Sequence, residues 1–140
     1  MDTVRTHIGL KRVSAVQPSP CGTWAVAVVA AVDDDTQKYR RQLWRVDLAG
    51  EGGPVPLTRG EHESHTPRFR HDGTLAFLSS RPATKDADPE AAGAVQVWAF
   101  ADTGGEPEPL TDEPLGVTDF RCARRTDLLA VWTSRLPGVA

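Results

Sequence analysis

The sequence predicts an all-β protein built from repeated antiparallel sheets, and three observations lead to this prediction. The chain has 12 glycines and 11 prolines among 140 residues, which favours many short elements separated by turns. Its apolar segments are short and rich in β-branched and aromatic residues, as strands are. A three-part pattern also recurs with a period slightly above fifty residues, which falls in the range of four-stranded propeller blades. We therefore expect an incomplete β-propeller of about two and a half four-stranded antiparallel blades.

The first copy of the pattern covers approximately residues 13–60. It contains a turn at 19–22, an apolar run at 24–32, a strand at 42–48 and a closing segment at 56–58. The run at 24–32 is apolar on both faces, as expected of a strand buried on both sides. Its four alanines leave an α-helix as the alternative interpretation.

The strand at 42–48 is predicted from its periodicity. Trp44, Val46 and Leu48 occupy every second position, and such period-two spacing is typical of a strand. A polar loop, residues 33–39, connects it to the apolar run and should lie on the surface.

The second copy covers approximately residues 61–113. A turn at 71–73 contains Asp-Gly, a strong hairpin signal, and strands follow at 75–78 and 95–100 before the closing segment 109–111. The third copy, residues 114–140, contains strands near 119–122 and 128–132, and the sequence ends before its later parts.

The spacings between equivalent residues agree with one another. Gly22 and Gly73 are 51 residues apart, Trp44 and Trp98 are 54 apart, and Thr58 and Thr111 are 53 apart. No linker or change of composition marks a second domain, so we expect residues 1–140 to form one partial propeller.

Charge and hydropathy exclude several classes of function. A formal net charge of −3 argues against nucleic-acid binding, which needs a basic face, and against a polybasic membrane surface. The longest apolar run has nine residues, whereas a membrane-spanning helix needs about twenty. The first ten residues contain no apolar signal segment, and Cys21 and Cys122 are predicted to be reduced thiols. We expect a cytoplasmic protein.

The most site-like cluster is Glu61-His62-Glu63-Ser64-His65. Two histidines three residues apart suggest a metal site, but in a strand they point to opposite faces. Zinc normally needs at least three protein ligands, and the third is not evident, so a polar loop is the favoured interpretation.

Other candidates have ordinary structural explanations. Three aspartates at 33–35 suggest calcium but lack the ligand spacing of an EF-hand, and Arg124-Arg125 is expected in a solvated turn. Ser64 lies beside His65, and Asp119 or Asp127 could complete a triad only if the fold brought them together. Four tryptophans recur in the pattern and are predicted to pack between blades; they are Trp24, Trp44, Trp98 and Trp132. We predict no catalytic, cofactor-binding or metal-ligating residue and no cofactor.

Several motifs resemble blades of the prolyl oligopeptidase family, in particular acylaminoacyl-peptidases and dipeptidyl aminopeptidases. The matching segments are Ser-Pro-Cys-Gly-Thr-Trp at 19–24, Leu-Trp-Arg-Val-Asp-Leu at 43–48, Leu-Thr-Arg-Gly at 57–60, Thr-Pro-Arg-Phe at 66–69 and Leu-Thr-Asp at 110–112. The resemblance covers about residues 13–132. Cys21 replaces the usual turn aspartate, and the second copy is one residue short after its turn. TolB-like propellers carry a similar repeat.

The resemblance implies a seven-bladed propeller covering an α/β-hydrolase domain with a Ser-Asp-His triad. The sequence has no Gly-x-Ser-x-Gly nucleophile elbow, and none of its serines lies in that context; they are Ser14, Ser19, Ser64, Ser79, Ser80 and Ser134. The resemblance therefore implies an N-terminal propeller fragment of a serine peptidase that hydrolyses short peptides, without the catalytic domain and non-catalytic by itself. A non-catalytic TolB-like module that binds proteins is the alternative.

The length of the chain bears on its partners. Even a four-bladed propeller needs about 200 residues at this period. The chain is therefore expected to be the product of a truncated gene or a fragment of a longer protein. Two alternatives are that several copies assemble into one ring, or that the chain is a compact small sheet protein that forms no ring. Peptide substrates are expected only in a full-length enzyme, and open blade edges could allow self-association.

Overall fold

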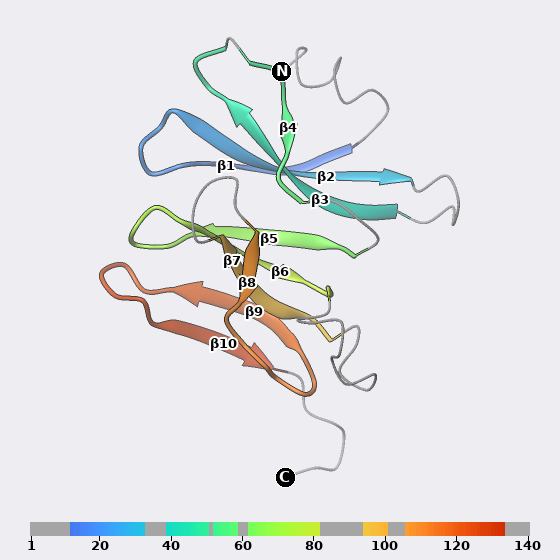
Figure 1. Cartoon of the computed structure of the whole chain (residues 1–140), viewed down its shortest axis with the longest axis vertical. Helices are drawn as coiled ribbons and strands as arrows, with labels where there is room; N and C mark the ends of the chain where they lie inside the picture. The colour runs from blue at the N-terminus through green and yellow to red at the C-terminus, as the bar shows by residue number, and fades with distance from the viewer. Residues whose placement is uncertain are drawn as a thin grey trace. The chain divides into compact units, whose positions relative to one another are not determined.

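The computed structural model describes residues 12–32, 39–50, 52–58, 62–81, 94–100 and 106–133. These residues form ten strands and no helix (Figure 1). The strands are β1 (Arg12–Pro18), β2 (Trp24–Val32), β3 (Tyr39–Asp47), β4 (Val55–Pro56), β5 (Ser64–Phe69), β6 (Leu75–Ser79), β7 (Gln96–Phe100), β8 (Pro107–Pro109), β9 (Val117–Cys122) and β10 (Leu129–Thr133). The predicted all-β class is confirmed. Among the described residues, no helix has the length and hydrophobicity that crossing a bilayer requires.

The chain divides into two compact units, Met1–Pro67 and Arg68–Ala140. The first unit contains a four-stranded sheet in the order β1-β2-β3-β4. Its strand pairs are antiparallel, and β2 pairs with β3 from Trp24 opposite Asp47 to Val32 opposite Tyr39. The strand predicted over 24–32 is confirmed and the helix alternative is wrong, because frequent valines and burial on both faces outweigh the helix propensity of alanine.

Strand β2 forms the core of the first unit. Its first six residues are all buried. On one face, Ala27 and Val29 pack with Trp44 and Val46 of β3, while the alternate residues of β2 point to the other face. Burying one valine side chain stabilises the fold by roughly 1.5–3 kcal/mol, so this strand contributes much of the unit's stability.

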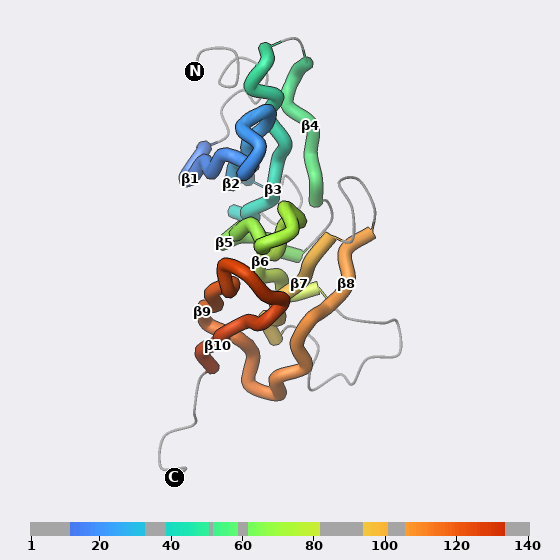
Figure 2. Tube along the Cα trace, turned by 90° about the vertical axis from the view of Figure 1, so that its left-hand side faces the viewer, coloured from blue at the N-terminus to red at the C-terminus, as the bar shows by residue number. Residues whose placement is uncertain are grey.

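The second four-stranded sheet has the order β5-β6-β7-β8, and β9 and β10 form an antiparallel hairpin. One side of the β6–β7 pair packs against that hairpin (Figure 2). The buried residues of this cluster are Ala76, Leu78, Val97, Ala99, Val117 and Phe120. Leu129 and Val131 of β10 are partly buried against the cluster, so one face of the hairpin is covered.

A contact between a glutamine and a threonine holds the third strand of the first sheet to the segment after β4. Thr58 Oγ1 donates a hydrogen bond to Gln42 Oε1 at 2.6 Å and accepts one from the Leu43 N–H at 2.9 Å. Gln42 Nε2 also donates to the carbonyl oxygen of His62 at 2.9 Å. The buried Leu43 amide therefore has a side-chain acceptor, as a buried polar group requires.

The same Gln–Thr contact occurs in the second sheet. Thr111 Oγ1 donates to Gln96 Oε1 at 2.6 Å and accepts from the Val97 N–H at 3.0 Å. Gln96 Nε2 donates to the carbonyl oxygen of Glu113 at 2.8 Å. The repeat inferred from the sequence is thus a repeat of structure down to individual hydrogen bonds.

The turns that join the first two strands of each sheet differ in length. In the first sheet the Ser19 N–H donates to the Trp24 carbonyl at 2.8 Å, five residues on, whereas in the second the Arg70 N–H donates to the Thr74 carbonyl at 2.8 Å, four residues on. The predicted one-residue shortening of the second copy is confirmed. Gly73 has a φ of 88°, which glycine adopts without steric cost.

Burial of the four tryptophans corrects one prediction. Trp24 and Trp98 are buried, and Trp44 is partly buried. The Arg45 guanidinium lies 4.4 Å from the centre of the Trp24 ring. Trp132, however, is 51% exposed, because its neighbour Val131 faces the core cluster and alternate residues of a strand face opposite sides.

Candidate functional site

The predicted Glu-His-Glu-Ser-His cluster lies at the start of β5, except for Glu61, which is outside the described residues. The guanidinium of Arg41 in β3 donates two hydrogen bonds to Glu63, from Nε to Oε1 at 3.2 Å and from Nη2 to Oε2 at 3.1 Å. Hydrogen bonding to this guanidinium holds the pKa of Glu63 below its usual range. The Glu63 carboxylate is therefore engaged in an ion pair.

The two histidines of the cluster have different surroundings. His65 is half-buried, and its Nδ1 lies 2.8 Å from Thr66 Oγ1. Burial lowers the pKa of His65, and the nearby charge of Arg41 lowers it further, so this environment favours the neutral ring. His62 contributes its backbone carbonyl to Gln42. Within the described ranges, neither histidine belongs to a group of three ligand atoms close enough to hold a metal ion.

Thr66 has an unusual backbone conformation in the middle of β5. Its φ of 54° is the only positive φ of a non-glycine residue in the described part of the chain. This region is costly for a β-branched residue, and Pro67 follows directly. Residues held in such conformations cluster at functional sites. The strain at Thr66 therefore makes this part of β5 a candidate for a functional site.

The residues considered for a catalytic triad are placed as follows. Ser64 is buried in β5. Asp119 accepts hydrogen bonds from Arg68 at 3.1 Å and from the Phe120 N–H at 2.8 Å. Ser14 Oγ donates to the Val28 carbonyl at 3.4 Å, Ser79 Oγ accepts from the Arg81 N–H at 3.3 Å, and Ser80 follows β6. Ser134 and the aspartates at 33–35 lie outside the described residues. Arg124 and Arg125 are exposed in the connection between β9 and β10, as predicted.

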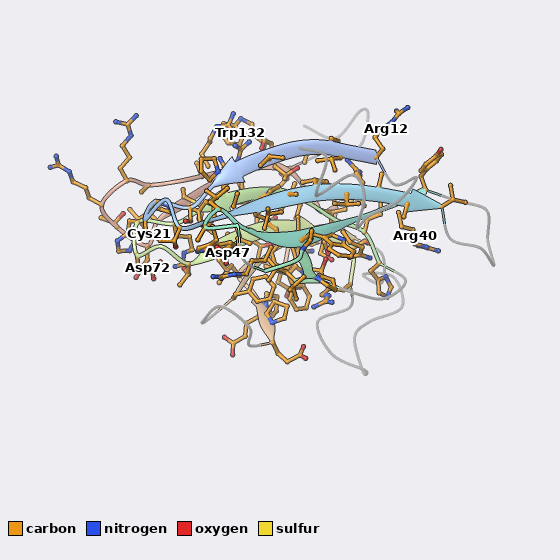
Figure 3. All side chains as sticks on the ribbon, turned by 90° about the horizontal axis from the view of Figure 1, so that it is seen from above. Arg12, Cys21, Arg40, Asp47, Asp72 and Trp132 are labelled. Atoms are coloured by element: carbon orange, nitrogen blue, oxygen red, sulfur yellow. The ribbon has the colours of Figure 1, made fainter. Side chains whose placement is uncertain are left out.

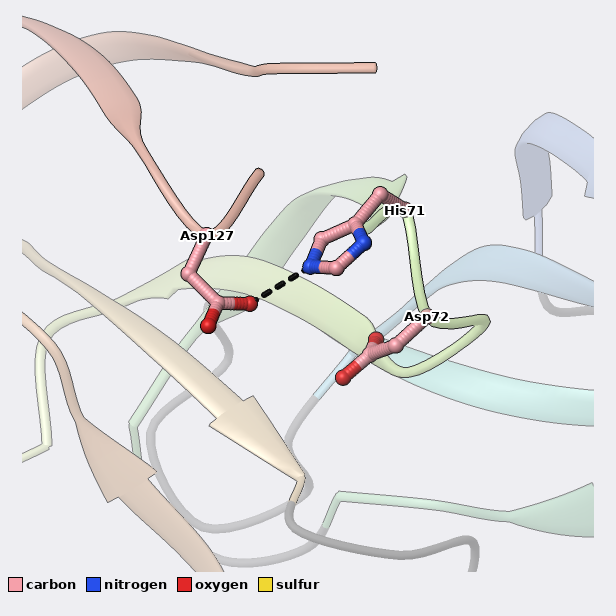
Figure 4. Close-up of side chains that lie close together, drawn as sticks. All are labelled: His71, Asp72 and Asp127. Carbon is pink, nitrogen blue, oxygen red and sulfur yellow. Dashed lines mark hydrogen bonds and ion pairs between the residues drawn. The ribbon is translucent and has the colours of Figure 1, made fainter. Parts of the chain in front are cut away.

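The structure also brings together His71, Asp72 and Asp127, which sequence reasoning did not group (Figure 4). Their ligand atoms all lie within 4.8 Å of one another. His71 and Asp72 belong to the turn between β5 and β6, and Asp127 to the connection between β9 and β10. His71 Nε2 lies 2.6 Å from Asp127 Oδ1, although 56 residues separate the two in sequence.

The ligand atoms of this cluster already have hydrogen-bond partners. Asp127 Oδ1 also accepts from Arg70 Nη2 at 3.3 Å, and a guanidinium at the same oxygen disfavours a bound cation. Asp72 Oδ1 accepts from the Thr74 hydroxyl at 2.6 Å and from the Thr74 N–H at 2.9 Å, which lowers the pKa of Asp72. The cluster is best described as a hydrogen-bond network in which Arg70 and His71 of one turn both contact Asp127 of the other.

Cys21 has a thiol whose surroundings favour its ionised form. Its Sγ lies 3.3 Å from Ser19 Oγ and 3.1 Å from Thr23 Oγ1, in the exposed turn between β1 and β2 (Figure 3). Hydrogen bonds from Ser19 and then Thr23 lower the pKa of the thiol to about 7. Cys122 is the opposite case, because burial raises its pKa. Both cysteines are free thiols.

Comparison with known proteins gives one informative match. No family model matches the chain. The uncharacterized peptidase YuxL of Bacillus subtilis (strain 168) is 37% identical to it over 103 residues. The matched residues make up 73% of this chain and 14% of YuxL, so the chain spans only a small part of its relative's length. The similarity supports a link between this chain and a peptidase family.

Proposed function

We propose that the chain is an N-terminal propeller segment of a serine peptidase of the prolyl oligopeptidase family, of the acylaminoacyl- or dipeptidyl-peptidase type. The observation that carries this proposal is the 37% identity to a peptidase over 103 residues that amount to 14% of that protein. A match confined to so small a part points to one portion of a larger enzyme.

The fold supports the proposal. Two sheets with the same strand order, the same Gln–Thr contact and a following hairpin are what consecutive blades and part of a third would look like. The chain's own sequence has no Gly-x-Ser-x-Gly elbow. The nucleophile would belong to a hydrolase domain outside residues 1–140, and the segment would limit which peptides reach it.

The first experiment measures hydrolysis by the purified chain. Acyl-peptide and aminoacyl-naphthylamide substrates are the probes, each with and without a serine-directed inhibitor. We expect no turnover above the buffer rate. Turnover that the inhibitor abolishes would place a nucleophile within residues 1–140 and contradict the proposal.

The second experiment reads the genomic DNA that follows the codon for Ala140. A continuation in any reading frame that encodes further repeats and then a Gly-x-Ser-x-Gly elbow supports the peptidase. Further repeats followed by a stop codon, with no hydrolase domain, would instead assign a TolB-like binding propeller.

A further inference from the structure

Among the described residues, strand β10 has no neighbour along one edge, where the equivalent strands β2 and β6 have one. It is the second strand of its sheet, as β2 and β6 are of theirs, and each of those lies between two strands. Within the described ranges β10 pairs only with β9. All five residues of β6 are buried, whereas none of β10 is. Leu128, just before β10, is 72% exposed, and Trp132, near the end of the strand, is 51% exposed.

In both four-stranded sheets, the equivalent edge is paired with a third strand of similar sequence. The neighbouring strand contains glutamine, an aliphatic residue and tryptophan in succession, at residues 42–44 in β3 and 96–98 in β7. Trp44 lies opposite Ala27 of β2, and Trp98 lies opposite Phe77 of β6. The strand that pairs with β2 and the strand that pairs with β6 therefore share the sequence glutamine, aliphatic residue, tryptophan.

A second segment closes each of these strands in the same way. The Leu57 N–H donates to the Leu43 carbonyl at 2.8 Å, and the Leu110 N–H donates to the Val97 carbonyl at 2.7 Å. The threonine that follows each leucine makes the Gln–Thr contact. The covering unit is thus a pair of segments, the first reading Gln-aliphatic-Trp and the second ending in Leu-Thr.

We propose that the free edge of β10 binds a pair of segments of this chemistry, supplied by polypeptide outside residues 1–140. Among the described residues no strand pairs with this edge, and the backbone N–H and C=O groups along a strand edge can add a further strand. Trp132 and Ala130 present an exposed face beside it. The inference rests on the internal repeat and does not depend on the peptidase assignment.

A second copy of the chain is a poorer occupant. Its two segment pairs of this kind are already closed in their own sheets, each through a Gln–Thr contact of 2.6 Å. To supply one of them, a second copy would have to open a folded sheet and leave buried amides such as that of Leu43 without an acceptor, at a cost of about 1–3 kcal/mol for each.

The test extends the full chain by a duplicate of its own residues 80–113, appended after Ala140. This duplicate carries the loop, the Gln-Val-Trp strand and the Leu-Thr closing segment of the second sheet. We expect the amides of residues 129–133 to exchange with deuterium about tenfold more slowly than in the unextended chain.

The matched control is the same extension in which the duplicate's counterparts of Gln96 and Thr111 are alanine and valine, and it should lose most of the protection. A tethered segment is present at millimolar effective concentration, so unchanged exchange in the extended chain contradicts the proposal. Dimerisation of the unextended chain that already protects residues 129–133, and that Trp132→Ser abolishes, would identify a second copy as the occupant and also contradict it. These exchange and dimerisation results are independent of the hydrolysis assay, so the binding proposal and the peptidase proposal can fail separately.

Discussion

Cys21 lies in a turn whose two hydroxyl groups stabilise its thiolate, which is the form that reacts with electrophiles. Because Ser19 and Thr23 lower the pKa of the thiol to about 7, we expect its alkylation by iodoacetamide to reach half its maximal rate near that pH. An ordinary cysteine does so at about pH 8.5. The measurement is the rate of Cys21 modification against pH, followed by mass spectrometry of the folded chain.

Two comparisons make this prediction specific. Ser19→Ala removes the hydroxyl with the largest effect and should move the midpoint upward. Cys122, whose pKa is raised by burial, serves as an internal reference and should react only at higher pH. A midpoint for Cys21 above that of Cys122 contradicts the assignment.

The Arg41–Glu63 ion pair makes stability depend on pH in a defined direction. The pKa of Glu63 is lower in the folded chain than in the unfolded chain. The stabilisation is therefore fully present above the unfolded pKa of about 4.3 and is lost as the pH falls through the lower folded value. Because both side chains are partly exposed, the pair contributes at most about 1 kcal/mol.

Glu63→Gln tests this pair by urea unfolding at a series of pH values. The variant should be less stable than the parent at pH 7, and the difference should shrink towards zero in acid. Glu108→Gln, at an exposed position, is the control and should change little at any pH. An equal loss of stability at pH 7 and in strong acid would show that Glu63 acts through packing.

These residue contacts illustrate the limit of reading a site from sequence. Glu63 was singled out because it stands in a cluster, but its partner Arg41 is 22 residues away. His71 and Asp127 are 56 residues apart and share no motif. Pairs of this kind depend on the register of the strands, which local patterns do not specify.

At the scale of elements, the Gln–Thr contact should contribute measurably to the stability of each sheet. Thr58→Val keeps the shape of the side chain but removes the acceptor for the buried Leu43 N–H. We expect a loss of about 1–3 kcal/mol in the free energy of unfolding, measured by urea titration. Thr133→Val, at an exposed position, is the control, and equal stability of the two variants would refute the role of the contact.

The turn before β9 depends on a glycine for a second reason besides its φ of 82°. A Cβ on Gly116 would lie 3.1 Å from the backbone nitrogen and 3.2 Å from the oxygen of Val95. At Gly50, with a φ of 85°, a Cβ would meet nothing within 4 Å. Gly50→Ala should therefore cost only the conformational strain, about 1–2 kcal/mol.

Gly116→Ala should cost more than Gly50→Ala, because the backbone of Val95 must also move. The Val117 N–H donates to the Val95 carbonyl at 2.7 Å, so this movement would loosen the attachment of β9 to the segment before β7. Thermal unfolding of both variants measures the difference. Equal melting temperatures would mean that the close approach has no energetic consequence.

Elements with a strong hydrophobic pattern were predictable, and elements without one were not. The run at 24–32 and the Asp-Gly turn were found because burial and turn chemistry leave clear signals. The first strand of the first sheet was not assigned, because six of its seven residues are exposed and no apolar periodicity results. The first strand of the second sheet contains Pro67 and the strained Thr66, which hide its pattern.

At the scale of the whole molecule, the repeat explains both what is buried and what is exposed. Each complete four-stranded sheet covers both edges of its second strand, and the hairpin leaves one edge of β10 without a neighbour among the described residues. The same reasoning accounts for Trp132, whose exposure was not expected from its place in the repeat. The sequence period revealed that units repeat, and the structure identifies which contacts repeat with them.

The most direct test of this account is an NMR measurement of strand pairing in the chain. Two parallel sets of cross-strand NOEs are predicted, one joining Ala27 to Trp44 and the other joining Phe77 to Trp98, because these pairs lie opposite one another in equivalent sheets. Helical chemical shifts across residues 24–32, or only one of the two sets of NOEs, would contradict the claim that the chain repeats a single sheet plan.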